Sequence, residues 1–218
     1  MEDVSFNDID VPNDLPTPSD ASPDIWENSI NPDAVLSPPD VDVMEDTSRQ
    51  IGNPEELSEY WQMQVGSTDC ALYAQGGILE AKGQDFDLEK YREQGVGGGW
   101  YTPEDGTYLD HLGDLLEENG VSIARYDSAS IQDMASELDQ GHGVVAPVDC
   151  LPIWGEPGGH ALWVTGIEVG SDGIPVSITC NDPGRPDGEA ISYEFEDFKQ
   201  AWGLFGNIMV ATTDSINH

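Results

Sequence analysis

The chain has 218 residues, of which 43 are acidic and 7 are basic, so its formal net charge at pH 7 is -36. A surface this acidic repels the phosphates of nucleic acids and of anionic membranes, which proteins bind through Lys and Arg. The composition therefore argues against nucleic-acid and membrane partners, and the length suits one globular domain with an additional segment.

The acidic residues are spread along the whole chain. Residues 1–50 hold 13 acidic residues and one basic residue, a net charge of -12, and the rest hold 30 and 6, a net charge of -24. A folded part this acidic suits a salt-rich environment, where self-repulsion is screened. The N-terminus lacks the basic and apolar regions of a secretory signal, and the odd number of cysteines implies no disulfide framework. A cytoplasmic location is therefore expected.

An acidic, disordered arm is predicted over residues 1–52, because this stretch is rich in Asp, Pro, Ser and Asn and has little to bury. Two apolar islands interrupt it, one at Ile25 and Trp26 and one at residues 34–36. The arm is either a solvating tail or a segment that binds a partner protein. Like charges on arm and domain disfavour docking of the arm on its own domain at low salt.

The domain is expected to span residues 53–218, with a helical first half. Asn53 before Pro54 and two glutamates is typical of a helix start. Apolar periodicity and glycine terminators predict helices at residues 53–64, 70–83, 87–95, 107–120 and 130–141, with a loop at 95–106. Gly76 and Gly77 lie inside the second helix at a cost of about 1 kcal/mol each relative to Ala, so another element should pack closely there.

The second half is predicted to be a sheet. After a strand at 121–127, short β-branched and aromatic runs predict strands at residues 143–150, 160–169, 174–182, 190–196 and 207–213, with a helix at 197–206. The Gly-Ser-Asp-Gly at 170–173 predicts a hairpin turn. A helical first half followed by a mostly antiparallel sheet indicates an α+β fold.

Cys70 begins the predicted helix 70–83 after a polar turn. A lone cysteine at this place is usually structural. The partial positive charge of a helix N-terminus nevertheless favours a thiolate, and the polar turn allows the sulfur to face a cleft. Cys150 and Cys180 end apolar runs and are interpreted as buried free thiols.

A thiol nucleophile requires a base and a group that orients the base. Among the four histidines, His160 is the best candidate, because it follows a glycine loop and begins a strand. The predicted hairpin folds the next strand back along it, which brings Asn181 or Asp182 within reach of the His160 ring. Either side chain would hold the tautomer and stabilise the imidazolium.

Gln64 lies six residues before Cys70. Its side-chain amide could donate to an oxyanion together with the backbone N–H of Cys70. The alternative is an exposed glutamine after a short helix, with no chemical role.

The order of these residues, with "GHALWVTGIE" at 159–168 and "CNDPG" at 180–184, resembles papain-like cysteine peptidases. The similarity is greatest to the bacteriocin-leader (double-glycine) peptidase-like branch and covers about residues 54–213. The chain departs from that branch after Cys70, where "ALY" replaces the common Gly-Pro.

The resemblance implies a papain-like fold, with the cysteine on a helix N-terminus and the histidine and aspartate on the sheet. It implies Cys70 as nucleophile, His160 as general base and then acid, and Asp182 as the orienting group, with Asn181 as a weaker rival. Gln64 would be the oxyanion donor. The implied activity is that of a thiol hydrolase, a cysteine peptidase acting on a peptide or protein substrate without a cofactor or metal.

Two alternatives use the same residues. One is an inactive papain-like module whose acidic surface recruits a basic protein. The other is a zinc site formed by Cys70, His160 and Asp182, which no Cys-x-x-Cys or His-x-x-x-His spacing supports.

Overall fold

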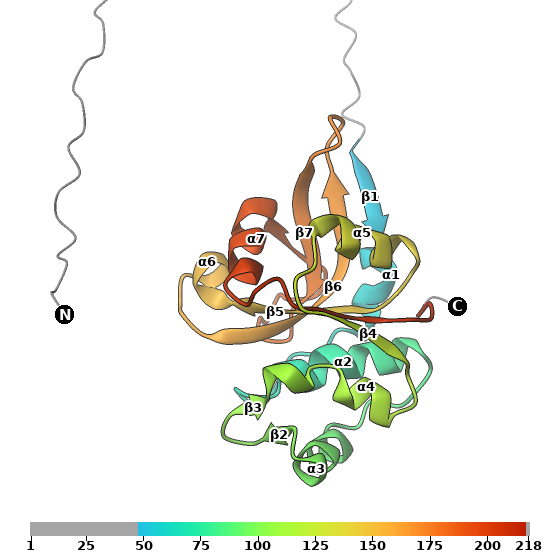
Figure 1. Ribbon diagram of the computed structural model, residues 1–218, viewed down its shortest axis with the longest axis vertical. Helices are drawn as coiled ribbons and strands as arrows, with labels where there is room; N and C mark the ends of the chain where they lie inside the picture. Colours follow the sequence, from blue (N-terminus) through green and yellow to red (C-terminus); the bar gives the residue numbers. More distant parts are fainter. Residues whose placement is uncertain (1–47, 217–218) are drawn as a thin grey trace, which may run out of the picture. The chain divides into compact units, whose positions relative to one another are not determined.

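The computed structural model describes residues 48–216 (Figure 1). Most of the predicted arm, with both apolar islands, lies outside the described residues. Within them, no helix is long and apolar enough to cross a membrane.

The first described element lies inside the stretch assigned to the arm. Strand β1, Arg49–Gly52, pairs antiparallel with β6, Gly159–Val169, from Arg49 opposite Val169 to Gly52 opposite Gly166. A side chain at Gly52 would meet the backbone oxygen of Thr165 at 2.4 Å. Regular structure therefore begins four residues earlier than the predicted boundary at residue 53.

The first half is helical, as predicted, but its helices differ in length from the prediction. It contains α1 Pro54–Leu57, η1 Ser58–Tyr60, α2 Cys70–Ala81, α3 Leu88–Gly98, η2 Leu109–His111 and α4 Asp114–Glu118. The predicted helix 53–64 stops at Tyr60 because tertiary contacts extend the chain beyond it. The indole N–H of Trp61 donates to the carbonyl of Asp182, and the N–H of Gln64 donates to that of Pro183.

The prediction of one helix over residues 107–120 is wrong. Gly113, with φ 105°, separates η2 from α4, and a side chain there would lie 2.5 Å from Cδ1 of Ile123. The predicted loop 95–106 is also partly ordered, because α3 continues to Gly98 and a small hairpin follows. Its strands are β2 Tyr101–Thr102 and β3 Gly106–Thr107.

The second half forms an antiparallel sheet, which confirms the α+β prediction. The strands run in the order β4-β9-β5-β6-β7-β8, with β1 on β6. Their bounds are β4 Ile123–Tyr126, β5 Val144–Asp149, β7 Pro175–Asn181, β8 Ile191–Glu194 and β9 Met209–Thr212. Three helices accompany it: α5 Ile131–Asp139, α6 Cys150–Trp154 and α7 Phe195–Gly203.

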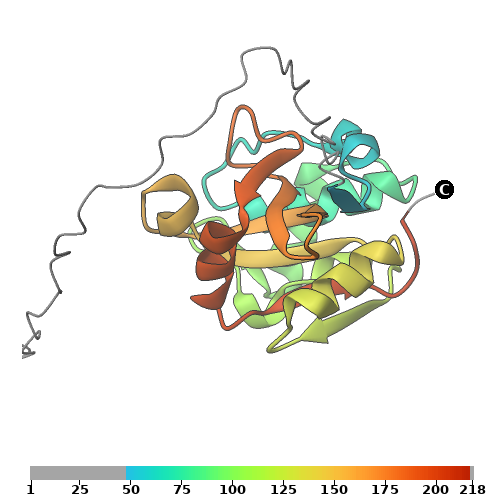
Figure 2. The same ribbon diagram turned by 90° about the horizontal axis from the view of Figure 1, so that it is seen from above.

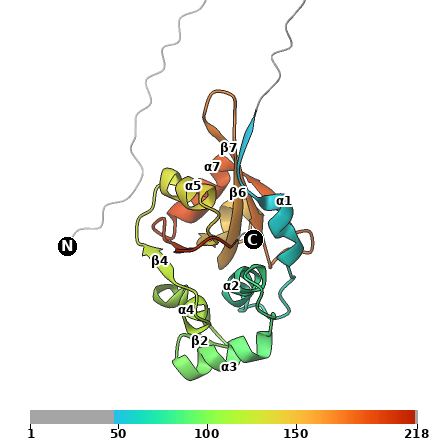
Figure 3. The same ribbon diagram turned by 90° about the vertical axis from the view of Figure 1, so that its right-hand side faces the viewer.

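Both faces of the sheet are buried. Helices α2 and α4 lie on one side of it, and α5 and α7 lie on the other (Figures 1 and 3). Figure 2 looks onto the side of α5 and α7. Alternation along β6 places Ala161 and Trp163 in the core with α2, and Leu162 and Val164 in the core with α7.

The two glycines inside α2 allow the close packing expected from the sequence. A side chain at Gly76 would lie 2.5 Å from the ring of Phe86, and one at Gly77 would lie 2.8 Å from the ring of Trp163. Helix α2 therefore sits directly on β6, which brings the start of α2 and the start of β6 to the same place.

Candidate active site

Cys70 is the first residue of α2, with Asp69 at the N-cap. It is partly exposed, whereas Cys150 and Cys180 are buried. Burial raises the pKa of the Cys150 thiol to about 12, and it also raises the pKa of Cys180. Among the three thiols, only that of Cys70 is accessible to a substrate.

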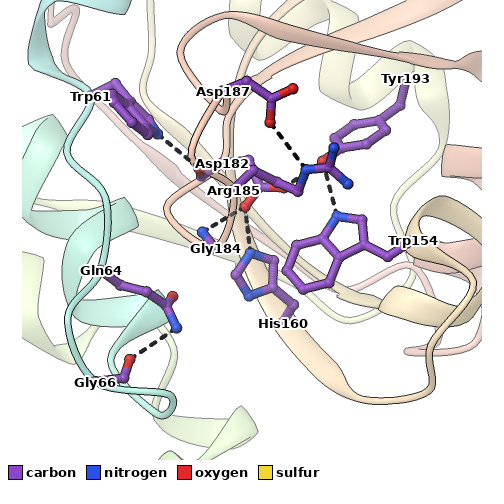
Figure 4. A network of polar contacts seen from close by, with 10 residues as sticks. All are labelled: Trp61, Gln64, Gly66, Trp154, His160, Asp182, Gly184, Arg185, Asp187 and Tyr193. Atoms are coloured by element: carbon purple, nitrogen blue, oxygen red, sulfur yellow. Dashed lines mark hydrogen bonds and ion pairs between the residues drawn. The ribbon is translucent and has the colours of Figure 1, made fainter.

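His160 and Asp182 are in direct contact (Figure 4). Nε2 of His160 lies 2.8 Å from Oδ1 of Asp182, and the two residues are 7% and 0% exposed. An ionised carboxylate only accepts hydrogen bonds, so Nε2 carries the proton and Nδ1 is left for the sulfur. The chain brings the start of β6 to the residue after β7 through the predicted hairpin.

The environment of His160 favours its charged form. Burial alone would lower the pKa of His160, but hydrogen bonds to Asp182 and to Cys70, with their negative charge, outweigh burial and raise the pKa to about 9. The charged imidazolium is thus the favoured form of His160 at neutral pH.

Asn181 does not contact His160. Its Nδ2 donates to the carbonyl of Leu57 at 2.7 Å, and its Oδ1 accepts from the N–H of Ala190 at 3.1 Å. Both ends of the amide therefore join segments of the main chain. Of the two candidates from the sequence, only Asp182 reaches the ring.

Two aromatic residues complete this network, and sequence reasoning missed both. The hydroxyl of Tyr193 donates to Oδ2 of Asp182, and Nε1 of Trp154 donates to the Tyr193 oxygen at 3.1 Å. The Trp154 ring packs on His160 with 4.6 Å between centroids. Each is one aromatic residue in a predicted strand or a short apolar stretch, so no sequence signal marks it.

Gly184 allows the network to close. Its N–H donates to Oδ1 of Asp182 at 2.8 Å (Figure 4). A side chain there would lie 2.5 Å from Trp154 and 2.9 Å from Cε1 of His160. A residue larger than glycine would therefore push the Trp154 and His160 rings away from Asp182.

Gln64 lies on the segment before α2, across from His160 in Figure 4. Its Nε2 donates to the carbonyl of Gly66 at 2.9 Å, and its Oε1 is buried without a partner. An amide nitrogen has two hydrogens. One holds the Gly66 turn, and the second makes no hydrogen bond to the described residues.

Cys70 and His160 line a cavity of about 210 Å³. Its other walls include the turn at Ser67 and Thr68, the β2–β3 hairpin and the apolar side chains of Leu109, Leu112, Pro147 and Phe205. A second cavity of about 390 Å³ shares Leu109 and Leu112 with it. The two cavities form adjoining hollows large enough for parts of an extended peptide.

The other described histidines lie elsewhere. His111 contacts Asp114, and His142 contacts Glu137, and neither lines the cavity. Across residues 48–216, no group of three or more His, Cys, Asp and Glu side chains is placed to hold a metal ion. The zinc reading of Cys70, His160 and Asp182 is therefore unsupported.

Comparison with known proteins identifies the family of the chain. Residues 55–210 match the sequence model of the Peptidase_C39 like family. The chain belongs to this family of peptidases. The membership confirms the resemblance that "GHALWVTGIE" and "CNDPG" indicated. None of the curated proteins matches the chain.

Two solved structures share the C39-like fold. A C39-like peptidase from Bacillus anthracis has a TM-score of 0.57 and 14% identity, over 76% of this chain and 98% of that one. The peptidase domain of Streptococcus ComA, a bifunctional ABC transporter in a quorum-sensing pathway, has a TM-score of 0.53 and 15% identity, over 71% and 98%. At these identities the likeness concerns the fold.

Proposed function

We propose that the chain is a cysteine peptidase that cleaves a peptide bond through Cys70, His160 and Asp182. The observation that carries the proposal is the buried 2.8 Å contact of His160 with Asp182, in the wall of the cavity that Cys70 also lines. A base held by a carboxylate and facing a thiol is the arrangement that thiol hydrolases require.

The reaction would begin with attack of the Cys70 thiolate on the carbonyl carbon. The S–C bond forms while the carbonyl oxygen becomes an oxyanion. The free hydrogen of Gln64 Nε2 and the backbone N–H of Cys70 are its donors, because the first N–H groups of a helix have no partner within the helix.

The tetrahedral intermediate would collapse as His160 gives its proton to the leaving amine, which breaks the C–N bond and leaves an acyl-enzyme. His160, now neutral, takes a proton from water, and the resulting hydroxide attacks the thioester. The acid product leaves, and the thiolate and imidazolium are restored. Asp182 orients the ring in both steps.

Digestion of a peptide library by the wild type and by Cys70→Ala, read by mass spectrometry, tests the proposal. We expect cleavage by the wild type alone. Alkylation by iodoacetamide is the second measurement. Cys70 should react far faster than Cys150 and Cys180, and its rate should persist below pH 7.

An inactive module would give a different result. Three thiols of equal, slow reactivity, together with no cleavage of any peptide, would refute the peptidase and favour a binding role for the acidic surface.

A further inference from the structure

The residue before the nucleophile is a buried carboxylate. Asp69 is 1% exposed. Its Oδ1 accepts from the hydroxyl of Tyr101 at 2.7 Å, and its two oxygens accept from Nη2 and Nε of Arg92 at 2.5 and 3.3 Å. A single side chain thus joins the start of α2 to α3 and to β2.

Asp69 is paired with one of the few basic residues of this chain, since only 7 of 218 residues are Lys or Arg. The partner of most acidic residues is therefore water. Burial of the Asp69 carboxylate costs desolvation free energy that its contact with Arg92, whose side chain is 30% exposed, only partly recovers. Apolar residues can often replace such a pair without loss of stability, so the buried carboxylate at this position calls for another explanation.

Asp69 also organises the turn before Cys70. The N–H of Asp69 donates to the carbonyl of Gly66 at 3.4 Å, and a hydrogen bond from the Gly66 backbone lowers the pKa of the Asp69 carboxyl. A side chain on Gly66 would lie 2.1 Å from Oδ2 of Asp69, so only glycine fits there. The carbonyl of the same Gly66 accepts from Nε2 of Gln64 at 2.9 Å. Arg92, Asp69, Gly66 and Gln64 thus form one continuous chain of hydrogen bonds.

The same turn carries one wall of the cavity. The hydroxyl of Thr68 donates to the carbonyl of Pro103 at 2.9 Å. A side chain at Gly106 would lie 2.7 Å from the backbone oxygen of Thr68. Tyr101, which holds Asp69, belongs to the same hairpin. The position of this wall relative to Cys70 therefore depends on the contacts of Asp69.

We infer that Asp69 is the positioning residue of the oxyanion hole. Held by Arg92 and Tyr101, it sets the turn that aims the amide of Gln64 and the N–H of Cys70 at one point. The inference rests on the proposed function and deepens it. Since hydrogen-bond donors act on the transition state only when aligned, misalignment lowers kcat more than it raises KM.

Asp69→Asn tests the inference, because it keeps the shape and removes the charge that holds Arg92. The measurements are kcat and KM on a peptide that the wild type cleaves, the Ki of the aldehyde of that peptide, and the iodoacetamide rate. The aldehyde forms an S–C bond with Cys70 and places its oxygen in the oxyanion hole, whereas alkylation expels iodide and needs no such hole.

We expect Asp69→Asn to lower kcat by about 10- to 100-fold, with an aldehyde Ki that rises in parallel. KM and the alkylation rate should stay within about threefold. Glu89→Gln is the matched control, because Glu89 contacts the same guanidinium through Nη1 at 2.8 Å but is exposed. It should behave like the wild type.

Unchanged kcat in Asp69→Asn, or an alkylation rate that falls as much as kcat does, would overturn the inference. If Asp69→Asn folds poorly in a thermal scan, Tyr101→Phe, which removes only the hydroxyl on Oδ1, decides. Tyr101→Phe should lower kcat and raise the Ki of the aldehyde in parallel. No effect on either quantity would also overturn the inference. A wild type that cleaves nothing would refute the proposed function itself.

Discussion

Asp182 contacts Nε2 of His160 at 2.8 Å, while the side chain of its neighbour Asn181 bonds only to the main chain of Leu57 and Ala190. Adjacent residues of similar shape thus have different surroundings. Their alanine variants should therefore fail in different ways.

Asp182→Ala should lower turnover by about 10³-fold or more, because the His160 ring loses the group that holds its tautomer. Cys70 should remain open to alkylation. Asn181→Ala should instead lower the free energy of unfolding by about 1–3 kcal/mol, since two buried backbone groups lose their partner, with a small effect on turnover. Peptide cleavage and urea unfolding measure the two quantities, and the reverse ranking would assign the orienting role to Asn181.

The pH profile follows from the pKa of His160. His160 must be protonated to donate to the leaving amine, and its pKa is raised to about 9. The value of kcat/KM should therefore fall on the alkaline side with an apparent pKa near 9.

Asp182→Asn should move this alkaline limb to lower pH. The carboxylate raises the pKa of His160 through its hydrogen bond and charge, so removing that charge lowers the pKa. An alkaline limb that does not move would mean that another group limits the rate.

Tyr193→Phe should lower turnover by roughly tenfold without preventing folding. The change removes the donor to Oδ2 of Asp182 and leaves Nε1 of Trp154 without its acceptor. A hydrogen bond to a charged group contributes about 1.5–3 kcal/mol. Tyr108→Phe, at a tyrosine 40% exposed, is the control. Equal turnover in both variants would contradict a positioning role for Tyr193.

Two truncations separate the arm from the domain. Deletion of residues 1–47 should leave the thermal midpoint and the alkylation of Cys70 nearly unchanged, as expected for an arm that does not dock on the domain. Deletion of residues 1–52 should lower the midpoint, because it removes β1, the pairing of β1 with β6 and the Arg49–Asp139 contact.

If the shorter deletion unfolds the protein or greatly accelerates alkylation, the arm packs on the domain. If the two deletions have equal midpoints, β1 contributes no stability.

Salt should stabilise the domain. Residues after 50 carry 30 acidic and 6 basic residues, and every Arg is already bonded to a carboxylate, as in Arg125 with Asp114 and Arg185 with Asp187. Repulsion among the remaining carboxylates is screened as the Debye length falls from about 10 Å at 0.1 M to 3 Å at 1 M. The thermal midpoint should rise with KCl and then level off, and a midpoint that falls would contradict self-repulsion.

Much of the site could be predicted because local patterns carry it. A polar turn followed by a helical run placed Cys70 at the start of α2. A glycine loop, a β-branched run and a Gly-Ser-Asp-Gly turn placed His160 at the start of one strand and Asp182 at the end of the next, close to each other. These signals depend on residues close together in the chain, where backbone geometry and burial act directly.

Other features depend on contacts between distant residues. The helix breaks at Gly113, where the chain passes close to Ile123. The first helix ends early because Trp61 and Gln64 bond to Asp182 and Pro183. Periodicity within 107–120 or 53–64 contains no record of those partners, so the predicted helices were too long.

The sequence by itself determined the α+β class, the hairpin and the residue types that meet at the site. Only the tertiary structure decided between Asn181 and Asp182 as the partner of His160. It also brought Tyr193 and Trp154 into the network and placed Arg92 against the buried Asp69. The physical reason is that strand pairing predicts which segments lie side by side, but only to a precision of a few residues. Which of two neighbouring side chains reaches a ring depends on the atoms that fill the remaining space, and those come from elsewhere in the chain.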